Sequence, residues 1–169
     1  MLYKQYYGYA MSVSLRYSRN KEEAVEIVND GFVKIFRKLD LYTMGKPFRG
    51  WLRRIMINAA IDHYRQNEKH YHALDISHAN LYPVHEEALD LLSAQEIMEA
   101  VQRLPVSYRM VFNLHAIEGY KHEEISTMLN ISVGTSKSNL SVARSKLKKF
   151  LLEDRDGSDT YQIKQDHGR

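Results

Sequence analysis

The sequence predicts an all-α protein with two small helical domains joined by a linker, the second a three- to four-helix domain with a helix-turn-helix. Long segments repeat apolar residues near the 3.6-residue period of an amphipathic helix, and no segment alternates convincingly as a half-buried strand would. Proline and glycine, the strongest interrupters of helices, number only 3 and 8 in 169 residues. Hydrophobic residues make up 44% of the chain, which is enough for a packed core.

Three helices are expected at the start of the chain. The first runs from about Leu2 to Tyr17. Asn20 is a suitable N-cap for the second helix, from Lys21 to about Leu39. A loop around Gly45 and Pro47 precedes the third helix, from Phe48 to about Gln66. The apolar stripe predicted for the second helix consists of Ile27, Val28, Gly31, Phe32, Ile35, Phe36 and Leu39.

The distribution of charge divides the chain more clearly than its total, since the net charge is only +3. Lysine and arginine are absent from residues 71–102, which hold six acidic residues, whereas both flanking segments are basic. We therefore expect four parts: a first domain (1–68), a linker (69–92), a second domain (93–152) and a flexible tail (153–169). Helical periodicity resumes near Glu86, towards the end of the linker.

The second domain is expected to end in a helix-turn-helix. Pro105 and Gly119 bound a helix over Val106–Ile117. A short helix over Glu123–Leu129 follows, then Asn130, which tolerates a left-handed turn, and Ser132, which can cap the next helix.

That last helix is basic and begins with short polar side chains. Residues 135–149 contain no acidic residue. Hydroxyl, amide and ammonium groups at the start of a helix can reach base edges in a major groove, so the pattern indicates double-stranded DNA as a partner. The same pattern also fits a solvated basic face on a protein that never binds DNA. The short polar residues are Thr135, Ser136, Lys137, Ser138 and Asn139.

Several classes of function find no support. The chain has no cysteine, which excludes a disulfide framework, a thiolate zinc site and a cysteine nucleophile. The eight histidines are loosely spaced, without an HExxH motif, and no phosphate-binding glycine-rich loop occurs. We expect no enzyme activity, no catalytic residue, no metal and no cofactor. No apolar run approaches the length of a membrane span and no signal peptide is evident, so we expect a cytoplasmic protein without membrane insertion.

Three segments resemble the extracytoplasmic-function (ECF) group of bacterial sigma factors, within the sigma-70 family. Residues 23–37 (EAVEIVNDGFVKIFR) resemble the family's acidic helix. Residues 48–65 (FRGWLRRIMINAAIDHYR) resemble its F-x-x-W-L-x-x-I-x-x-N-x-x-x-D-x-x-R helix. Parts of residues 104–138, including LPVSYRMVF and VGTSKS, resemble its second DNA-binding domain. The three segments occur in the family's order, with a linker between the second and the third.

The resemblance implies a dissociable subunit that directs the RNA polymerase core to specific promoters and initiates transcription. The implied partners are the polymerase core, double-stranded promoter DNA and the locally melted minus-ten strand, with an anti-sigma factor as a further candidate. The first domain would bind the core polymerase and the minus-ten element, and the second the minus-thirty-five element. Catalysis would belong to the polymerase.

The resemblance also implies site residues. Acceptors spaced three and four apart on one helical face would bind the core polymerase, although such a face is often merely solvated. Asn58 would pair with a flipped base of the minus-ten element, or make a structural hydrogen bond. Nearby arginines would neutralise phosphates, which sets affinity and register but not sequence. The expected polymerase contacts are Glu23, Glu26, Asn29 and Asp30; the expected minus-ten contacts are Arg49, Arg53, Arg54, Asn58 and Arg65.

For the minus-thirty-five element, Lys137 would donate to guanine and Asn139 would pair with adenine. Thr135 would contact phosphate through its hydroxyl and backbone N–H. The full expected set is Thr135, Lys137, Ser138, Asn139, Arg144 and Lys146.

Some positions depart from the family pattern. Lys121 stands where a serine or threonine cap is common, Ser126 replaces a small alanine, and Asn139 and Val142 replace frequent arginines. The chain also begins almost inside the tyrosine-rich helix, so the first domain's packing and the completeness of the N-terminus stay open. The alternative function is a helix-turn-helix regulator of transcription that acts without the polymerase core.

Overall fold

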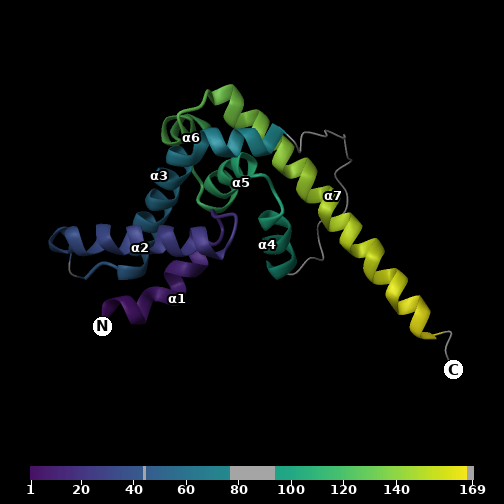
Figure 1. The fold of residues 1–169 in the computed structure, drawn as a ribbon, viewed down its shortest axis with the longest axis horizontal. Helices are drawn as coiled ribbons and strands as arrows, with labels where there is room; N and C mark the ends of the chain where they lie inside the picture. The colour runs from purple at the N-terminus through teal and green to yellow at the C-terminus, as the bar shows by residue number, and fades with distance from the viewer. Residues whose placement is uncertain (44, 77–93, 167–169) are drawn as a thin grey trace.

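The computed structural model describes residues 1–43, 45–76 and 94–166, with side chains described for 1–43, 45–69, 71 and 96–152. All regular structure in this part of the chain is helical, which confirms the predicted fold class (Figure 1). In chain order the elements are α1 (Leu2–Ser14), α2 (Lys21–Arg37), the 3₁₀ turn η1 (Leu39–Leu41), α3 (Phe48–Ile76), α4 (Ala94–Gln102), α5 (Val106–Phe112), the π-helical turn η2 (Asn113–Ile117), α6 (His122–Leu129) and α7 (Val133–Asp166).

Local signals set the ends of α2. The Asn20 side chain accepts a hydrogen bond from the backbone N–H of Glu23 at 2.9 Å, as predicted for an N-cap. Ile27, Val28 and Ile35 are buried against α1 and α3. Phe36 was expected in the same stripe but is 54% exposed, because Phe32 and Ile35 already fill the core side of this turn. Leu39 is exposed as well, beyond the end of α2.

The predicted helix-turn-helix is present. Gly119 has a φ of 79° and ends the preceding helical turn. Asn130 adopts the left-handed conformation, with φ 56° and ψ 42°, between α6 and α7. The Ser132 hydroxyl accepts the backbone N–H of Thr135 at 2.9 Å and so caps α7.

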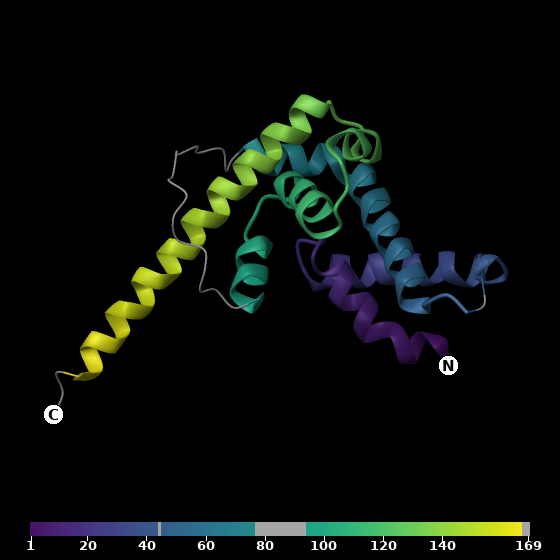
Figure 2. The ribbon, with the colours of Figure 1, turned by 180° about the vertical axis from the view of Figure 1, so that it is seen from behind.

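Two helices are longer than the sequence pattern indicated. The α3 helix continues past Gln66 to Ile76, and Tyr71 is buried there against Tyr64, with ring centroids 5.6 Å apart. The α7 helix continues to Asp166, through most of the segment expected to be a flexible tail, and projects away from the body of the molecule in both ribbon views (Figures 1 and 2). No proline follows Pro105, so nothing in the sequence forces α7 to stop earlier. The expected linker lies mostly outside the described residues.

The two helical domains pack directly against each other. The α3 helix of the first domain contacts α5 and α6 of the second (Figure 1). One hydrophobic cluster therefore includes Ile27 and Met56 together with Met110 and Leu114. A smaller cluster joins α4 to α7 through Ala100, Val101, Leu104, Ala143, Leu147 and Leu151. Among the described residues, no helix combines the length and apolar character that crossing a bilayer requires.

Gly31 in α2 and Gly8 in α1 give a matched test of this packing. A Cβ on Gly31 would overlap Sδ of Met56, which is fully buried, whereas a Cβ on Gly8 would meet nothing within 4 Å. Overpacking costs about 1–3 kcal/mol, and replacing a helical glycine by alanine returns at most about 1 kcal/mol. In denaturant unfolding we expect Gly31→Ala to destabilise the protein by about 1 kcal/mol and Gly8→Ala to stabilise it slightly. Equal effects at the two positions would contradict the close contact between α2 and α3.

Candidate polymerase and promoter interface

The exposed face of α2 carries three of the four residues expected to contact polymerase. Glu26, Asn29 and Asp30 are exposed, and Asn29 Oδ1 accepts a hydrogen bond from the Tyr3 hydroxyl at 3.3 Å. The fourth, Glu23, is only 8% exposed.

Glu23 is engaged within the chain. Its carboxylate accepts the backbone N–H of Arg19 at 2.8 Å and the Arg19 Nε–H at 2.5 Å. Burial alone would raise the pKa of Glu23, but the hydrogen bonds and charge of Arg19 outweigh burial and lower it. Glu23 therefore stays ionised and closes the turn before α2. Its role as a polymerase contact stays a prediction.

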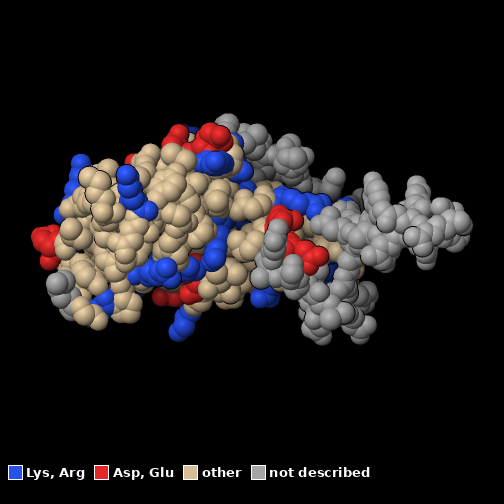
Figure 3. All heavy atoms as spheres, turned by 90° about the horizontal axis from the view of Figure 1, so that it is seen from below, with Lys and Arg blue, Asp and Glu red and all other residues tan. Residues whose placement is uncertain are grey.

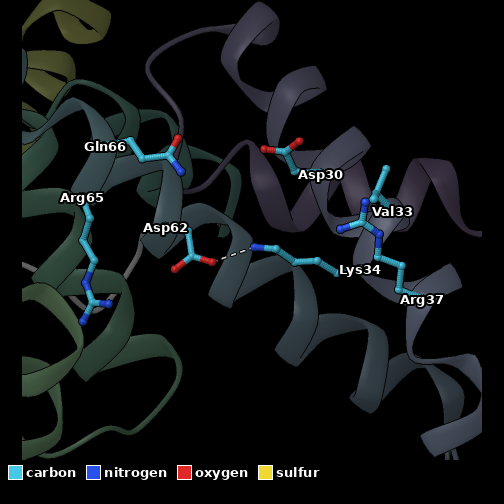
Figure 4. Close-up of a pocket in the computed structure, with 7 residues that line it drawn as sticks. All are labelled: Asp30, Val33, Lys34, Arg37, Asp62, Arg65 and Gln66. Atoms are coloured by element: carbon cyan, nitrogen blue, oxygen red, sulfur yellow. Dashed lines mark hydrogen bonds and ion pairs between the residues drawn. The ribbon is translucent and has the colours of Figure 1, made fainter.

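A groove of about 520 Å³ lies between α2 and α3, beside this face (Figure 4). Lys34 reaches across it from α2 to Asp62 on α3, with 2.6 Å between Nζ and Oδ2. The groove is lined by Asp30, Val33, Lys34, Arg37, Asp62, Arg65 and Gln66. Large apolar side chains are exposed where α2 ends and η1 follows: Val33, Phe36, Leu39 and Leu41. We call these four residues the α2–η1 apolar patch.

The structure divides the expected minus-ten residues into two groups. Arg49, Arg54 and Asn58 are exposed on α3, and Arg54 and Asn58 are four residues apart, so they share one side of the helix. Arg53 and Arg65 instead contact the second domain. The Arg65 Nη2 donates to the backbone carbonyl of Thr127 in α6 at 2.8 Å. Figure 3 shows that on the face seen from below, lysine and arginine side chains are interspersed with acidic and uncharged ones.

Arg53 forms a bidentate ion pair with Glu118, the residue that directly follows η2. The Nη2–Oε1 and Nε–Oε2 distances are 2.5 and 2.9 Å. The hydroxyl of Tyr17 also donates to Glu118 Oε1 at 3.2 Å. Tyr17 is 3% exposed, and burial together with the charge of Glu118 raises its pKa, so the hydroxyl remains protonated and can donate. Neither Tyr17 nor Glu118 was predicted as a functional residue, because no local pattern links positions 101 residues apart.

The start of α7 presents most of the expected minus-thirty-five residues. Thr135, Lys137, Ser138 and Arg144 are exposed, while Asn139 and Lys146 are half-buried. Ser136, included among the short polar groups that can reach bases, is fully buried. That part of the expectation is wrong, because position 136 lies on the side of α7 that packs on the rest of the domain.

Buried Ser136 is hydrogen-bonded to His122, the first residue of α6. The distance from His122 Nδ1 to Ser136 Oγ is 2.9 Å. The His122 ring stacks on His115, with centroids 4.5 Å apart and an interplanar angle of 12°. His115 Nδ1 lies 2.9 Å from the carbonyl of Tyr120, which can only accept, so this nitrogen carries the proton. Neither histidine was predicted from the sequence to have a role.

The surroundings of His122 disfavour its charged form. Desolvation, followed by the proximity of His115, Lys137 and Arg144, lowers its pKa, and Glu123 offsets this in part. A neutral His122 can join the start of α7 to the start of α6 through Ser136.

Comparison with known proteins identifies both domains. Residues 2–70 match the family model for sigma-70 region 2, and residues 94–147 match the model for sigma-70 region 4. The chain is 30% identical over 129 residues to RNA polymerase sigma factor SigZ of Bacillus subtilis, covering 74% of this chain and 73% of SigZ. It is 28% identical over 134 residues to ECF RNA polymerase sigma factor SigM of Mycobacterium tuberculosis, covering 79% of this chain and 67% of SigM.

A solved structure shows the same fold. The sigma factor RpoE from Bartonella quintana, crystallised in complex with the anti-sigma factor NepR, superposes with a TM-score of 0.51 at 23% identity, over 88% of this chain and 93% of that one. Taken with the family models and relatives, the chain belongs to the ECF group of the sigma-70 family. It is a sigma factor, which directs RNA polymerase to promoters.

The His122–Ser136 contact predicts a dependence of stability on pH. Because folding lowers the pKa of His122 below 6.5, the unfolded chain takes up a proton first as pH falls, and this group's stabilisation is lost from about pH 6.5 downward. We expect His122→Asn, which has a polar atom near the position of Nδ1, to show a smaller decrease in Tm between pH 7.5 and 5.5 than wild type. His63→Asn, outside the stack, is the control for the removal of an imidazole. Parallel pH profiles for all three proteins would refute this role.

Proposed function

We propose that this sigma factor binds core RNA polymerase through the exposed face of α2 and its adjoining groove, and promoter DNA through α3 and the start of α7. The observation that carries the proposal is the capped, exposed start of α7, with Thr135, Lys137 and Ser138 facing outward. It occurs in a chain whose two domains both match sigma-70 regions.

The surface around α2 has the composition of a protein interface. The α2–η1 apolar patch offers exposed apolar area, and Leu41 at 69% exposure is its most accessible member. Glu26, Asn29 and Asp30 supply polar groups beside it. Interfaces commonly combine an apolar centre with a polar rim. This arrangement favours a protein partner over the alternative of a DNA-binding regulator that ignores polymerase.

The DNA contacts divide between the two domains. On α3, Asn58 is exposed and would offer its amide to an unstacked base of the minus-ten strand, while the exposed Arg49 and Arg54 would neutralise phosphates. On α7, Lys137 and Asn139 would read base edges of the minus-thirty-five element. Ser138 would read the same element, and Thr135, Arg144 and Lys146 would position the helix on the backbone.

Further parts of the proposal rest on the similarity of this chain to other sigma factors. RpoE of Bartonella quintana was crystallised with an anti-sigma factor, and we propose that a protein of that kind binds this chain. We also propose that the chain acts in the cytoplasm and leaves catalysis to the polymerase, without a metal or cofactor of its own. The proposed domains are residues 1–68 and 93–152.

Charge reversal on α2 tests the polymerase contact. Asp30→Lys places a cation in the groove and beside the apolar patch. A polymerase surface that binds the acidic face of α2 would carry cations, and like charges brought together at an interface cost several kcal/mol. We expect its affinity for core polymerase to fall at least about tenfold in a titration with purified core enzyme, and Glu26→Lys to act in the same direction. Glu123→Lys carries the same change in charge on the exposed surface of α6 and is expected to bind normally. If the wild-type chain binds no core polymerase yet binds promoter DNA, the regulator alternative stands.

Substitutions in α7 test how the minus-thirty-five element is read. Lys137→Ala is expected to lose about 1–3 kcal/mol of discrimination at one base pair, measured as the ratio of affinities for cognate and substituted duplexes. Arg144→Ala is expected to weaken binding to all duplexes alike, with a smaller salt dependence, because it removes a phosphate contact. Unchanged discrimination in Lys137→Ala would show that Lys137 does not read a base.

A further inference from the structure

We propose that His122 is a further DNA contact of the second domain, whose imidazole takes up a proton as the minus-thirty-five duplex binds and donates a hydrogen bond to a backbone phosphate. The proposal rests on the proposed role of α7 in reading that element. It adds that the affinity of the chain for the duplex depends on pH and increases as the solution becomes more acidic.

The position of His122 places its ring beside the residues proposed to read DNA. His122 is the first residue of α6, which packs on α7 (Figure 1). Its Nδ1 lies 2.9 Å from the hydroxyl of buried Ser136, whose neighbours in α7, Thr135 and Lys137, are both exposed. In a helix-turn-helix the second helix enters the major groove while the first crosses the sugar-phosphate backbone. The ring is therefore held where that backbone would pass.

The bond between His122 and Ser136 can persist when the ring becomes charged. A serine hydroxyl can donate or accept, and both nitrogens of a charged imidazole donate. Neutral His122 can accept the hydroxyl proton at Nδ1, and charged His122 can donate from Nδ1 to the same oxygen. Within the described part of the chain, Nε2 of His122 has no hydrogen-bond partner, so it can donate to a ligand. A charged donor makes a hydrogen bond to phosphate roughly twice as strong as a neutral one does.

The stacked ring of His115 limits the pair to one proton. The two rings are nearly parallel, with centroids 4.5 Å apart, and His115 Nδ1 donates to the carbonyl of Tyr120. Two charged imidazoles at this separation would repel each other, so protonation of one disfavours protonation of the other. His122 is the ring that is bonded to α7, and we assign the proton to it.

The charges that surround His122 are mostly positive in the free chain. Desolvation and these neighbours together lower its pKa, so the ring is neutral near pH 7. The third element packed on α6 is α3, and its Arg65 is bonded to the carbonyl of Thr127, beyond the first turn of α6. The titratable and charged groups around the ring are His115 on η2, Glu123 on α6, and Lys137 and Arg144 on α7.

Duplex DNA would reverse this balance. It carries one negative charge per about 1.7 Å of helix axis. Phosphates bound to Lys137 and Arg144 would neutralise the charges that oppose protonation, and an anion within about 4–6 Å of the ring favours its charged form. The pKa of His122 would therefore rise on binding. By linkage, affinity increases as pH falls through the pKa of the bound ring and levels off below that of the free ring, by at most about tenfold per pH unit for one proton.

The test is the pH dependence of duplex binding, measured at constant ionic strength with the full-length chain and a duplex that the wild-type chain selects from a random library. We expect the affinity of wild type to increase at least about threefold from pH 7.5 to pH 6.0. His122→Asn keeps a polar atom near the position of Nδ1 but cannot be charged, so its affinity should change much less. His63→Asn removes an imidazole from α3, outside the second domain, and should keep the wild-type increase.

A second measurement decides the case in which His122→Asn does not fold. The imidazole proton signals of His122 in the wild-type chain report its pKa by NMR. We expect addition of the duplex to raise this pKa by at least about half a pH unit, which corresponds to the threefold change in affinity. Ser136→Ala removes the hydroxyl that holds the ring and should reduce this rise.

Three results would overturn the proposal: a wild-type affinity that does not increase at lower pH, an equal increase in His122→Asn, or a His122 pKa that the duplex leaves unchanged or lowers. Failure of the proposed function would look different, because Lys137→Ala and Arg144→Ala would then bind the duplex as wild type does. If those two variants lose affinity while His122→Asn keeps the wild-type pH dependence, only the role of His122 is wrong.

Discussion

A carboxylate that is largely buried is stable only beside cations or hydrogen-bond donors, and the first domain supplies both to Glu118. Arg53 supplies two N–H groups and Tyr17 supplies one O–H. Because Glu118 follows η2 and precedes Gly119, satisfying this one group fixes α5 and α6 against α3 and the end of α1. The relative placement of the two domains therefore depends on polar partners as well as on apolar burial.

The sequence predicted the fold well wherever the determining interactions are local. Asn20 and Ser132 cap the helices that follow them, and Asn130 makes the left-handed turn. Such features depend on residues within four positions of each other, so they can be read from the chain. The extension of α3 to Ile76 was missed because the acidic, histidine-rich stretch has weak periodicity, and burial of Tyr71 against Tyr64 supports the helix there.

The candidate site was predictable in outline but not in its contacts. A helical periodicity gives the direction of a side chain, but not what another element brings to meet it. Glu23 was placed on the solvent face, yet Arg19 draws its carboxylate inward. Ser136 was grouped with the DNA-reading residues, yet it is buried and bonded to His122. Arg53 and Glu118 are 65 residues apart, and no spacing rule pairs them.

The two proposed DNA-binding faces differ in what covers them, and this asymmetry has a physical consequence. The start of α7 is exposed, while α3 has two of its arginines held by the second domain. Duplex DNA attracts cations over its whole length, so a chain with both faces exposed would bind it nonspecifically. With Arg53 and Arg65 held by the second domain, α3 offers fewer unpaired cations to DNA, while the α2 face proposed for polymerase stays accessible.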